Sequence, residues 1–286
     1  MPGPSPEPNT PMFTLDHGLV FVRDLGRAAA AYRRLGFWLT PRGDHARLGT
    51  ANHTIMLEHD YLELLTIVTP GPENAQWDRT QEGLAAAALG TKDARAARQA
   101  LHERGIECPP VVDFERPVVL PTGTVAARFS VCHLPEDASP AIPAFCCQHH
   151  TPEYVWRPEY QRHPNSAADV VGMTVCHRHP ESLSAAYGRL LGTASVHPHP
   201  GGIELDLRNT KIWIVSPEYA RARLARRLDL PPSGTRPLAV TIRVRDPLTT
   251  RRVLSANGIP FRPFGRRSII IEPTWTNGVY LEFLSV

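Results

Sequence analysis

The stretch Asp16-His17-Gly18-Leu19-Val20-Phe21-Val22-Arg23-Asp24-Leu25 predicts a strand that leads directly into a helix. Its middle is apolar, as in a buried strand, and Asp24 stands where a side chain caps the first turn of a helix. The helix expected over Leu25 to Leu35 is followed by Gly36, a residue type that commonly ends helices. A second string, Tyr61-Leu62-Glu63-Leu64-Leu65, predicts a buried strand that carries one carboxylate.

This unit recurs along the chain. Val22-Arg23-Asp24-Leu25 returns as Val244-Arg245-Asp246-Pro247, and the second string returns as Tyr280-Leu281-Glu282-Phe283-Leu284. Strand patterns, helix starts and stop glycines recur in the same order at two further places, which predicts four β-α-β-β-β modules. Their expected ranges are 13–68, 83–150, 169–216 and 236–286.

The four modules predict an α+β fold organised as two pairs. The first domain is expected over residues 13–150 and the second over 169–286, joined by a polar, proline-containing linker at 151–168. Residues 1–12 are rich in proline and have no apolar core. This composition predicts a disordered tail rather than a secretory signal.

The overall composition is that of an ordinary globular protein. The 286 residues carry a formal net charge of +3, which is too small to indicate binding to nucleic acid. No apolar run reaches the roughly 18–20 residues needed to cross a bilayer. The five cysteines lie mostly in strand-like runs without a Cys-x-x-Cys pair, which favours reduced core residues and a cytoplasmic location. We expect a monomer or a homodimer with a small-molecule substrate.

Several strings together resemble a known superfamily. They are residues 15–25, Gly49-Thr50-Ala51-Asn52, residues 61–65, Phe145-Cys146-Cys147-Gln148-His149-His150 and His163-Pro164-Asn165. With modules in pairs, a histidine on the first strand and a glutamate on the last, the chain resembles the vicinal oxygen chelate (VOC) superfamily and its glyoxalase-like branch. The resemblance implies two VOC-type half-barrel domains. It also implies one divalent metal ion (Zn, Ni, Mn, Co or Fe), held by the first and last strands of the modules.

The resemblance implies His17 and Glu63 as metal ligands from the first module. The second module departs from the pattern, because Ala86 stands at the position of His17 when counted back from the helix cap. Its last strand offers Gln148, which matches an acidic position of the branch. His150 is expected on the same face, since side chains two apart on a strand point the same way. We therefore expect Gln148 and His150 to complete the ligand set.

Two of these assignments leave an alternative open. A carboxylate buried among apolar residues needs a cation, so Glu63 pairs either with a metal or with an arginine such as Arg47. His149 and His150 supply a ligand or a general base, or they only mark the exit of the strand to solvent.

The second pair of modules lacks most ligand-type residues. Gly172 and Ala239 stand at the position of His17, and only Glu282 remains. We expect Glu282 to be a salt-bridged or hydrogen-bonded carboxylate.

The resemblance implies an enzyme as the first candidate function. A metal-dependent lyase, isomerase or epimerase would act on a small oxygen-bearing metabolite through an enolate-type intermediate. Glu63 and His150 are the expected catalytic residues, and Asn52, His53 and Phe145 are expected to line the substrate pocket.

The second candidate is a metal-free protein that binds or sequesters a small hydrophobic or aromatic molecule. The missing ligands favour it, and aromatic residues such as Trp38, Phe145 and Trp156 would stack on such a molecule. In a third alternative, the second domain is only structural.

Overall fold

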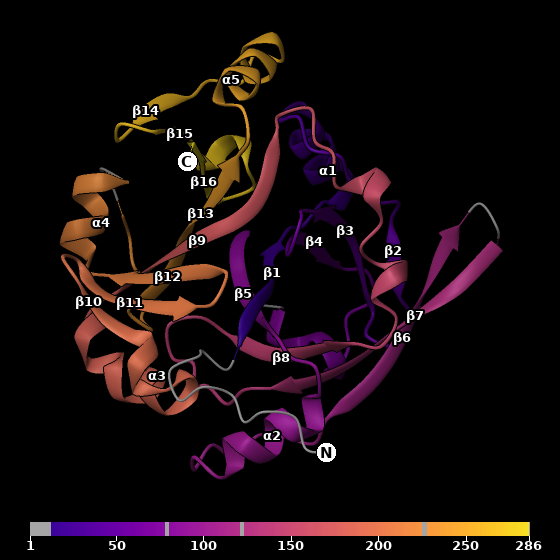
Figure 1. Cartoon of the computed structure of the whole chain (residues 1–286), viewed down its shortest axis with the longest axis vertical. Helices are drawn as coiled ribbons and strands as arrows, with labels where there is room; N and C mark the ends of the chain where they lie inside the picture. The colour runs from indigo at the N-terminus through magenta and orange to yellow at the C-terminus, as the bar shows by residue number, and fades with distance from the viewer. Residues whose placement is uncertain (1–12, 78–79, 121–122, 225–227, 286) are drawn as a thin grey trace, which may run out of the picture.

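A computed structural model describes residues 13–77, 80–120, 123–224 and 228–285. It contains two eight-stranded mixed sheets with helices at the periphery, as the α+β prediction requires (Figure 1). The predicted disordered tail, residues 1–12, lies outside the described residues. The boundaries predicted for the two domains and the linker stay a prediction.

The first sheet has the strand order β2-β3-β4-β1-β5-β8-β7-β6. Its elements, in chain order, are β1 (Thr14–Phe21), α1 (Leu25–Arg34), β2 (Gly43–His45), β3 (Thr50–Met56), β4 (Tyr61–Ile67), the 3-10 helix η1 (Pro72–Trp77), β5 (Gly83–Gly90), α2 (Ala94–His102), β6 (Val112–Leu120), β7 (Gly123–His133) and β8 (Ala144–His149). The sheet curls until its two edge strands, β2 and β6, contact each other. This curling makes the first sheet a cup, as the resemblance implied.

The second sheet repeats the arrangement, with the order β10-β11-β12-β9-β13-β16-β15-β14. Its elements are β9 (Ala167–His177), η4 (Pro180–Leu183), α3 (Ser184–Leu191), η5 (Thr193–Ser195), β10 (Val196–His199), β11 (Gly202–Leu207), β12 (Thr210–Val215), α4 (Pro217–Arg223), β13 (Thr235–Val244), α5 (Pro247–Ala256), β14 (Arg262–Phe264), β15 (Ser268–Ile271), η6 (Pro273–Trp275) and β16 (Tyr280–Ser285). The strand β10 was not expected, because its histidines and prolines are typical of a loop.

The helix starts depend on the predicted aspartate caps. The side chain of Asp24 accepts a hydrogen bond from Arg27 N, and Asp93 and Asp246 accept equivalent bonds at the starts of α2 and α5. Such a cap satisfies a backbone donor that the first helical turn leaves unpaired. The helix α3 differs, because a 3-10 turn precedes it and no side chain caps it.

The two modules of the first sheet are related by a local two-fold axis between β1 and β5. These strands are antiparallel, with His17 opposite Ala88 and Leu19 opposite Ala86. One and the same shift along the chain moves His17 onto Ala86 and Leu19 onto Ala88, so it maps each pair onto the other. Ala86 is therefore the counterpart of His17, as the count back from the helix cap also gave. Leu19 pairs with Glu63 on β4, and its counterpart Ala88 pairs with Phe145 on β8. The counterpart of Glu63 is therefore Phe145.

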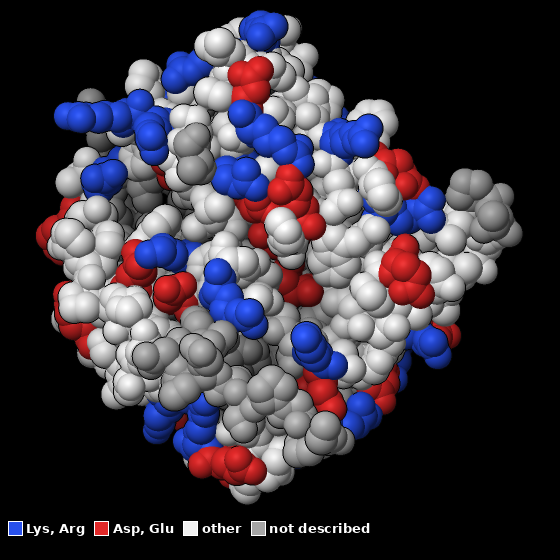
Figure 2. Space-filling model, in the orientation of Figure 1, with Lys and Arg blue, Asp and Glu red and all other residues white. Residues whose placement is uncertain are grey.

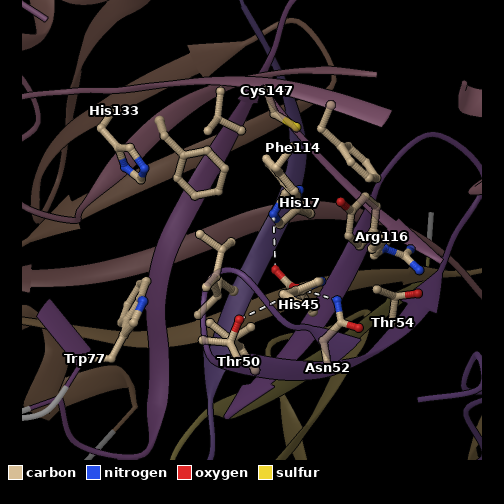
Figure 3. A pocket seen from close by; sticks show the side chains of 18 residues that line it. His17, His45, Thr50, Asn52, Thr54, Trp77, Phe114, Arg116, His133 and Cys147 are labelled. Carbon is tan, nitrogen blue, oxygen red and sulfur yellow. Dashed lines mark hydrogen bonds and ion pairs between the residues drawn. The ribbon is translucent and has the colours of Figure 1, made fainter. Parts of the chain in front are cut away.

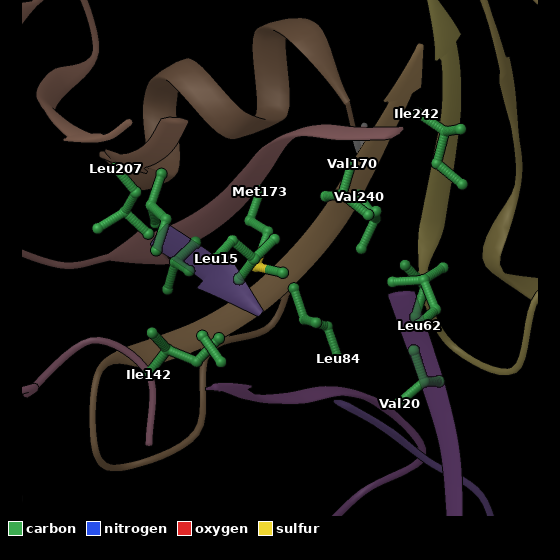
Figure 4. Packing of buried hydrophobic residues seen from close by; sticks show 14 of the residues in the cluster. Leu15, Val20, Leu62, Leu84, Ile142, Val170, Met173, Leu207, Val240 and Ile242 are labelled. Carbon is green, nitrogen blue, oxygen red and sulfur yellow. The ribbon is translucent and has the colours of Figure 1, made fainter. Parts of the chain in front are cut away.

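The two sheets share one hydrophobic cluster. Figure 4 shows Leu15, Leu62 and Leu84 of the first sheet packed with Met173 and Val240 of the second. All five side chains are at most 5% exposed. Burying such residues stabilises each by about 1.5–3 kcal/mol. The second sheet therefore supports the back of β1 and β4, the strands that carry His17 and Glu63.

The segment between the sheets is tied to the first module by buried polar side chains. His163 accepts a hydrogen bond from Trp38 N at 2.9 Å, and its other ring nitrogen donates to Met56 O at 2.8 Å. Asn165, which is fully buried, donates to Leu35 O and accepts from Ala167 N. These contacts give the string His163-Pro164-Asn165 a structural role.

Charged side chains of both signs are interspersed on the face shown in Figure 2. Among the described residues, no helix is long and apolar enough to cross a membrane. All five cysteines are free and buried, as predicted.

Asp60 lies at the junction of the sheets and carries an unsatisfied buried oxygen. Its Oδ1 accepts from Val170 N at 2.9 Å, and its Oδ2 has no hydrogen-bond partner among the described residues. Burial raises the pKa of Asp60 well above its ordinary value, and the carboxylates of Asp169 and Asp16 add to the effect.

Replacing Asp60 with Asn is expected to stabilise the protein more at pH 8 than at pH 5. An acid whose pKa is raised on folding favours the folded state below its unfolded pKa and loses this contribution as the pH rises. The amide stays neutral and keeps an acceptor for Val170 N. The free energy of unfolding gained by the variant over the wild type should therefore be larger at pH 8 than at pH 5. Urea denaturation at both pH values measures it, and a difference independent of pH would contradict the account.

Candidate functional site

A cavity of about 130 Å³ lies inside the first cup (Figure 3). Alternate residues of several strands point into it, as the period of two in a strand requires. His17, Asn52, Glu63, Phe145 and Cys147 lie on its wall. The rest of the wall is largely aromatic or apolar and includes Leu19, His45, Leu48, Thr50, Thr54, Tyr61, Leu65, Trp77, Phe114, Arg116, Phe129, Val131 and His133.

His17 and Glu63 face each other across neighbouring strands. The Nε2 atom of His17 lies 3.5 Å from Oε2 of Glu63, and both residues are buried. The imidazole stacks on the ring of Tyr61, with the centroids 4.4 Å apart. The pair therefore presents one nitrogen and one oxygen donor to the cavity.

Asp16 fixes the orientation of the His17 ring. The ladder between β1 and β5 shifts register between Leu15 and His17, so Asp16 lies at an irregularity in the strand. Its Oδ1 lies 2.6 Å from Nδ1 of His17. A carboxylate at Nδ1 is the usual second contact of a metal-binding histidine, because it keeps a proton on Nδ1 when Nε2 gives up its own proton to bind a metal.

The buried charges of this group stabilise one another. Although burial alone would lower it, the pKa of His17 is raised to about 9 by the hydrogen bonds and charges of Asp16 and Glu63. Burial alone would raise the pKa of Glu63, but His17, His45 and the amide of Asn52 lower it to about 2. Asn52 Nδ2 donates to Oε1 of Glu63 at 2.6 Å, which leaves Oε2 turned to His17. Glu63 pairs with His17 rather than with Arg47, whose guanidinium donates to Asp113 O instead.

Asp16 also binds a second imidazole. Its carboxylate accepts from Nε2 of His149 at 3.1 Å. The Nδ1 atom of His149 is buried and has no hydrogen-bond partner in the described part of the chain. Asp16, Cys147 and His149 bring three ligand-type atoms within 4.8 Å of one another. They form a second candidate donor group directly beside the His17–Glu63 pair.

A third donor group, Glu58, His59 and Asp169, lies at the junction of the sheets. Its carboxylates already form ion pairs with Arg243 and Arg245. The arginines balance the acidic charge, so this group needs no metal.

Gln148 and His150 do not join the cavity, contrary to the prediction. Phe145 and Cys147 point into it, so Gln148 points to the opposite face of β8, where its Oε1 accepts from Ala94 N at 3.0 Å. His150 follows the end of β8 and is exposed, with Nε2 2.7 Å from Ser130 Oγ. Gln148 and His150 share a face of the sheet, as predicted, but that face points away from the cavity.

Of the residues predicted to line the substrate pocket or to stack on a ligand, some line the cavity and others do not. Asn52 and Phe145 line the cavity. His53 points away, because it neighbours Asn52 on β3, and its Nδ1 lies 2.8 Å from Thr40 O. Trp38 is 52% exposed, so it does not line the cavity. Trp156 packs edge-on against Tyr61 and His149, with ring centroids 5.7 and 4.7 Å away.

Three residues of the candidate site were not predicted from the sequence. Asp16 could have been recognised in the sequence as a carboxylate next to a candidate ligand, whereas no local sequence pattern marks His45 or Arg116. His45 lies on the short strand β2, with its Nδ1 3.0 Å from Thr50 Oγ1. Burial lowers its pKa, and the charge of Arg116 adds to this. The carboxylates of Glu63 and Asp44 oppose this effect, and the net result is a pKa below the ordinary value of histidine.

The register identifies the positions of the second module that are equivalent to His17 and Glu63. They are Ala86 and Phe145. Of these four side chains, only those of His17 and Glu63 carry donor atoms. An imidazole and a carboxylate suit Zn, Ni, Mn, Co or Fe, and the clamped His17 ring fits such an ion. Two ligands are fewer than the three typical of catalytic zinc sites.

The second cup has lost this arrangement. Its four corresponding positions are Gly172, Trp213, Ala239 and Glu282. A Cβ atom on Gly172 would lie 2.3 Å from the Trp213 ring, so the indole occupies the space of the missing histidine. Glu282 accepts a hydrogen bond from Thr241 at 2.8 Å, in agreement with its predicted structural role.

Paired β-α-β-β-β modules that curl into cups are the architecture of the vicinal oxygen chelate superfamily, as the sequence resemblance implied. More narrowly, the glyoxalase-like domain family matches residues 15–191, more than half of the chain. The protein belongs to the glyoxalase-like domain family. No curated protein matches the chain.

Solved structures with a similar fold extend over both sheets. A hypothetical protein from Staphylococcus aureus is 13% identical with a TM-score of 0.68, and the match covers 96% of this chain and 100% of that one. A mutant of 4-hydroxymandelate synthase from Streptomyces coelicolor is 12% identical with a TM-score of 0.59, covering 96% and 93%. A xylose isomerase-like TIM barrel/4-hydroxyphenylpyruvate dioxygenase fusion protein is also 12% identical with a TM-score of 0.59, covering 100% and 51%. At these identities the likeness concerns the fold alone.

Proposed function

We propose that the protein is a divalent-metal-dependent lyase, isomerase or epimerase acting on a small oxygen-bearing molecule in the first cup. The observation that carries this proposal is the His17–Glu63 pair, with Nε2 and Oε2 3.5 Å apart and the His17 ring clamped by Asp16. A buried imidazole and carboxylate in this geometry offer two donors to one ion. The superfamily to which the chain belongs includes enzymes, which supports the same assignment.

In this proposal His17 Nε2 and Glu63 Oε2 hold the metal, and Asn52 keeps Glu63 in place by its hydrogen bond to Oε1. A bound divalent ion would supply Lewis-acid stabilisation of negative charge that develops on a substrate oxygen. With two protein ligands, several coordination positions remain for substrate oxygens. Tyr61 stacks on the His17 ring, and Phe145 contacts that ring edge-on.

His45 is the proposed general base, in place of the predicted His150. It lines the cavity, carries a pKa lowered by burial, and interacts electrostatically with Glu63. In its neutral form the His45 imidazole would accept a proton from the substrate carbon next to a carbonyl group and return it to a neighbouring atom on the same face. The proton returns to the substrate, so the step is a net isomerisation.

Replacing Asp16 with Asn is expected to lower the affinity for the metal by about 10–100-fold, as losses of such outer contacts typically do. The amide would no longer hold a proton on His17 Nδ1 by charge. Titration with Co²⁺ followed by visible absorption measures the affinity. Asp44→Asn, at the exposed Arg42–Asp44 pair, is the control and should bind Co²⁺ as the wild type does. Equal affinities in Asp16→Asn and wild type would contradict the role of Asp16.

Proton exchange tests the proposed reaction class. The protein, loaded in turn with Zn, Ni, Mn, Co or Fe(II), is incubated in D₂O with a panel of α-hydroxycarbonyl compounds. We expect the signal of the proton next to the carbonyl to disappear in the NMR spectrum of at least one compound. His45→Gln should slow this exchange at unchanged metal content. If no compound exchanges with any of the metals, the proposed enzyme class is wrong.

A second candidate, metal-free binding of a small molecule, is favoured by Ala86 and Phe145 at the two equivalent positions of the second module. It would use the same cavity. In either case we expect a small-molecule ligand, no nucleic acid and no membrane partner. A cytoplasmic location and a monomeric or homodimeric state stay predictions.

A further inference from the structure

Arg116 is a cation on the wall of the first cup that lacks a charged partner. Within the described ranges, it makes no hydrogen bond and no ion pair, and its guanidinium carbon lies 5.9 Å from the ring centroid of Phe129. A Cβ atom built on Gly43 would lie 3.4 Å from Arg116 Nη1 and 2.5 Å from Asn52 Oδ1. Figure 3 shows Arg116, Asn52 and Thr54 on one side of the cavity, opposite Trp77 and His133. The unpaired guanidinium thus belongs to the polar side of the site.

The acidic groups of the cup are already engaged. Asp16 binds both His17 and His149, and Glu63 binds His17 and Asn52. Neither carboxylate comes within ion-pair distance of Arg116. A half-buried guanidinium is costly to leave without an anion, and it is well suited to bind a carboxylate through two parallel hydrogen bonds.

The cavity as a whole matches one aromatic ring in size and in the chemistry of its wall. Its volume of about 130 Å³ is close to the ~150 Å³ of an engineered apolar cavity that binds benzene. Phe114 and Phe129 stack on each other at 5.1 Å and form the wall next to Arg116. Offset or edge-on contacts with such rings favour an aromatic ligand.

We propose that the ligand of the first cup is a small one-ring anion, whose carboxylate pairs with Arg116 while its ring packs against Phe114 and Phe129. This inference rests on the proposed function only in taking the His17–Glu63 cavity as the binding site. It makes Arg116 the residue that selects for a negatively charged ligand, in the metal-dependent enzyme and in the binding protein alike.

Benzoate and benzamide are suitable probes, because they have the same size and differ in charge. In NMR titrations we expect the wild type to bind benzoate about 10-fold more tightly than benzamide or better. Arg116→Gln should abolish this preference, and Arg116→Lys should restore part of it. Arg128→Gln removes the same charge from the exposed position on β7 and should keep the preference.

The proposal is overturned if the wild type binds neither probe, if it does not distinguish them, or if Arg116→Gln keeps the preference. The melting temperature of each variant shows whether it is folded, and Arg116→Lys keeps the test decisive if the glutamine variant is not. Metal content is measured in parallel. A preference for benzoate in a protein that neither contains nor takes up a divalent metal would contradict the metal-dependent function and leave the role of Arg116 intact.

Discussion

Replacing Glu63 with Gln is expected to reduce the affinity for a divalent metal by at least about 100-fold. The substitution removes the charge from one of the two protein ligands, which costs more than the 10–100-fold lost when an outer contact is removed. The amide keeps an oxygen that can accept from Asn52 Nδ2, so the strand should stay in place. Binding of Co²⁺ and Zn²⁺, measured by isothermal titration calorimetry, gives the ratio of affinities.

Glu282→Gln is the matched control for this variant. Glu282 occupies the corresponding position of the fourth module, in the string Tyr280-Leu281-Glu282-Phe283-Leu284, which closely repeats residues 61–65. The residue that corresponds to His17 beside it is Ala239, so Glu282 has no histidine to share an ion with. We expect metal affinity to be unchanged in Glu282→Gln. Equal losses in the two variants would show that the metal does not bind at the His17–Glu63 pair.

Replacing Gly49 with Ala is expected to destabilise the fold by roughly 3 kcal/mol, since it adds backbone strain to a steric clash. Gly49 has φ +63°, and an added Cβ would lie 2.3 Å from the carbonyl oxygen of Thr69. Its own carbonyl accepts from Val68 N and Thr69 N, so the backbone cannot easily move away. Gly49 directly precedes β3, the strand that brings Asn52 to the cavity, and urea denaturation measures the loss.

Gly105→Ala separates the two contributions. Gly105 also has a positive φ of +74°, but nothing lies within 4 Å of its added Cβ atom. The Gly105→Ala variant should therefore lose only the free energy of unfolding that corresponds to backbone strain, about 1–2 kcal/mol. If the two alanine variants lose the same amount, the close approach of Gly49 to Thr69 contributes nothing to stability.

The order of the modules could be predicted because each one carries local signals. An aspartate cap, an amphipathic helix and a glycine stop recur at Asp24, Asp93 and Asp246, and helix boundaries follow from them. The strand β10 was missed, since its stability comes from pairing with β11 rather than from its own residues. Closure of the cup by contact of β2 with β6 also depends on residues far apart in the chain.

The site could be predicted only where the residue type and the strand position agreed. His17 and Glu63 lie together, as expected. The ligands expected from the second module were wrong, because the β5–β8 register makes Phe145 the counterpart of Glu63. Gln148 is three residues further along the strand, so its side chain points to the opposite face. The role of Asp16 depends on a strand irregularity that no sequence pattern revealed.

The contributions of His45 and Arg116 could not be read from the sequence for a different reason. Each lies on an edge strand of the first sheet, and neither neighbours a predicted site residue in the chain. They reach the cavity only because the sheet curls and brings its edges together. Long-range closure of this kind has no signature in local periodicity.

Elemental analysis of the purified, untagged protein by mass spectrometry tests the central claim most directly. The proposed function predicts about one divalent transition metal ion per chain in the wild type or after incubation with Zn, Ni, Mn, Co or Fe(II), and its loss in His17→Ala with the fold intact. A wild-type protein that contains none of these metals, and takes up none of them, would contradict the metalloenzyme and leave the binding protein as the function of the first cup.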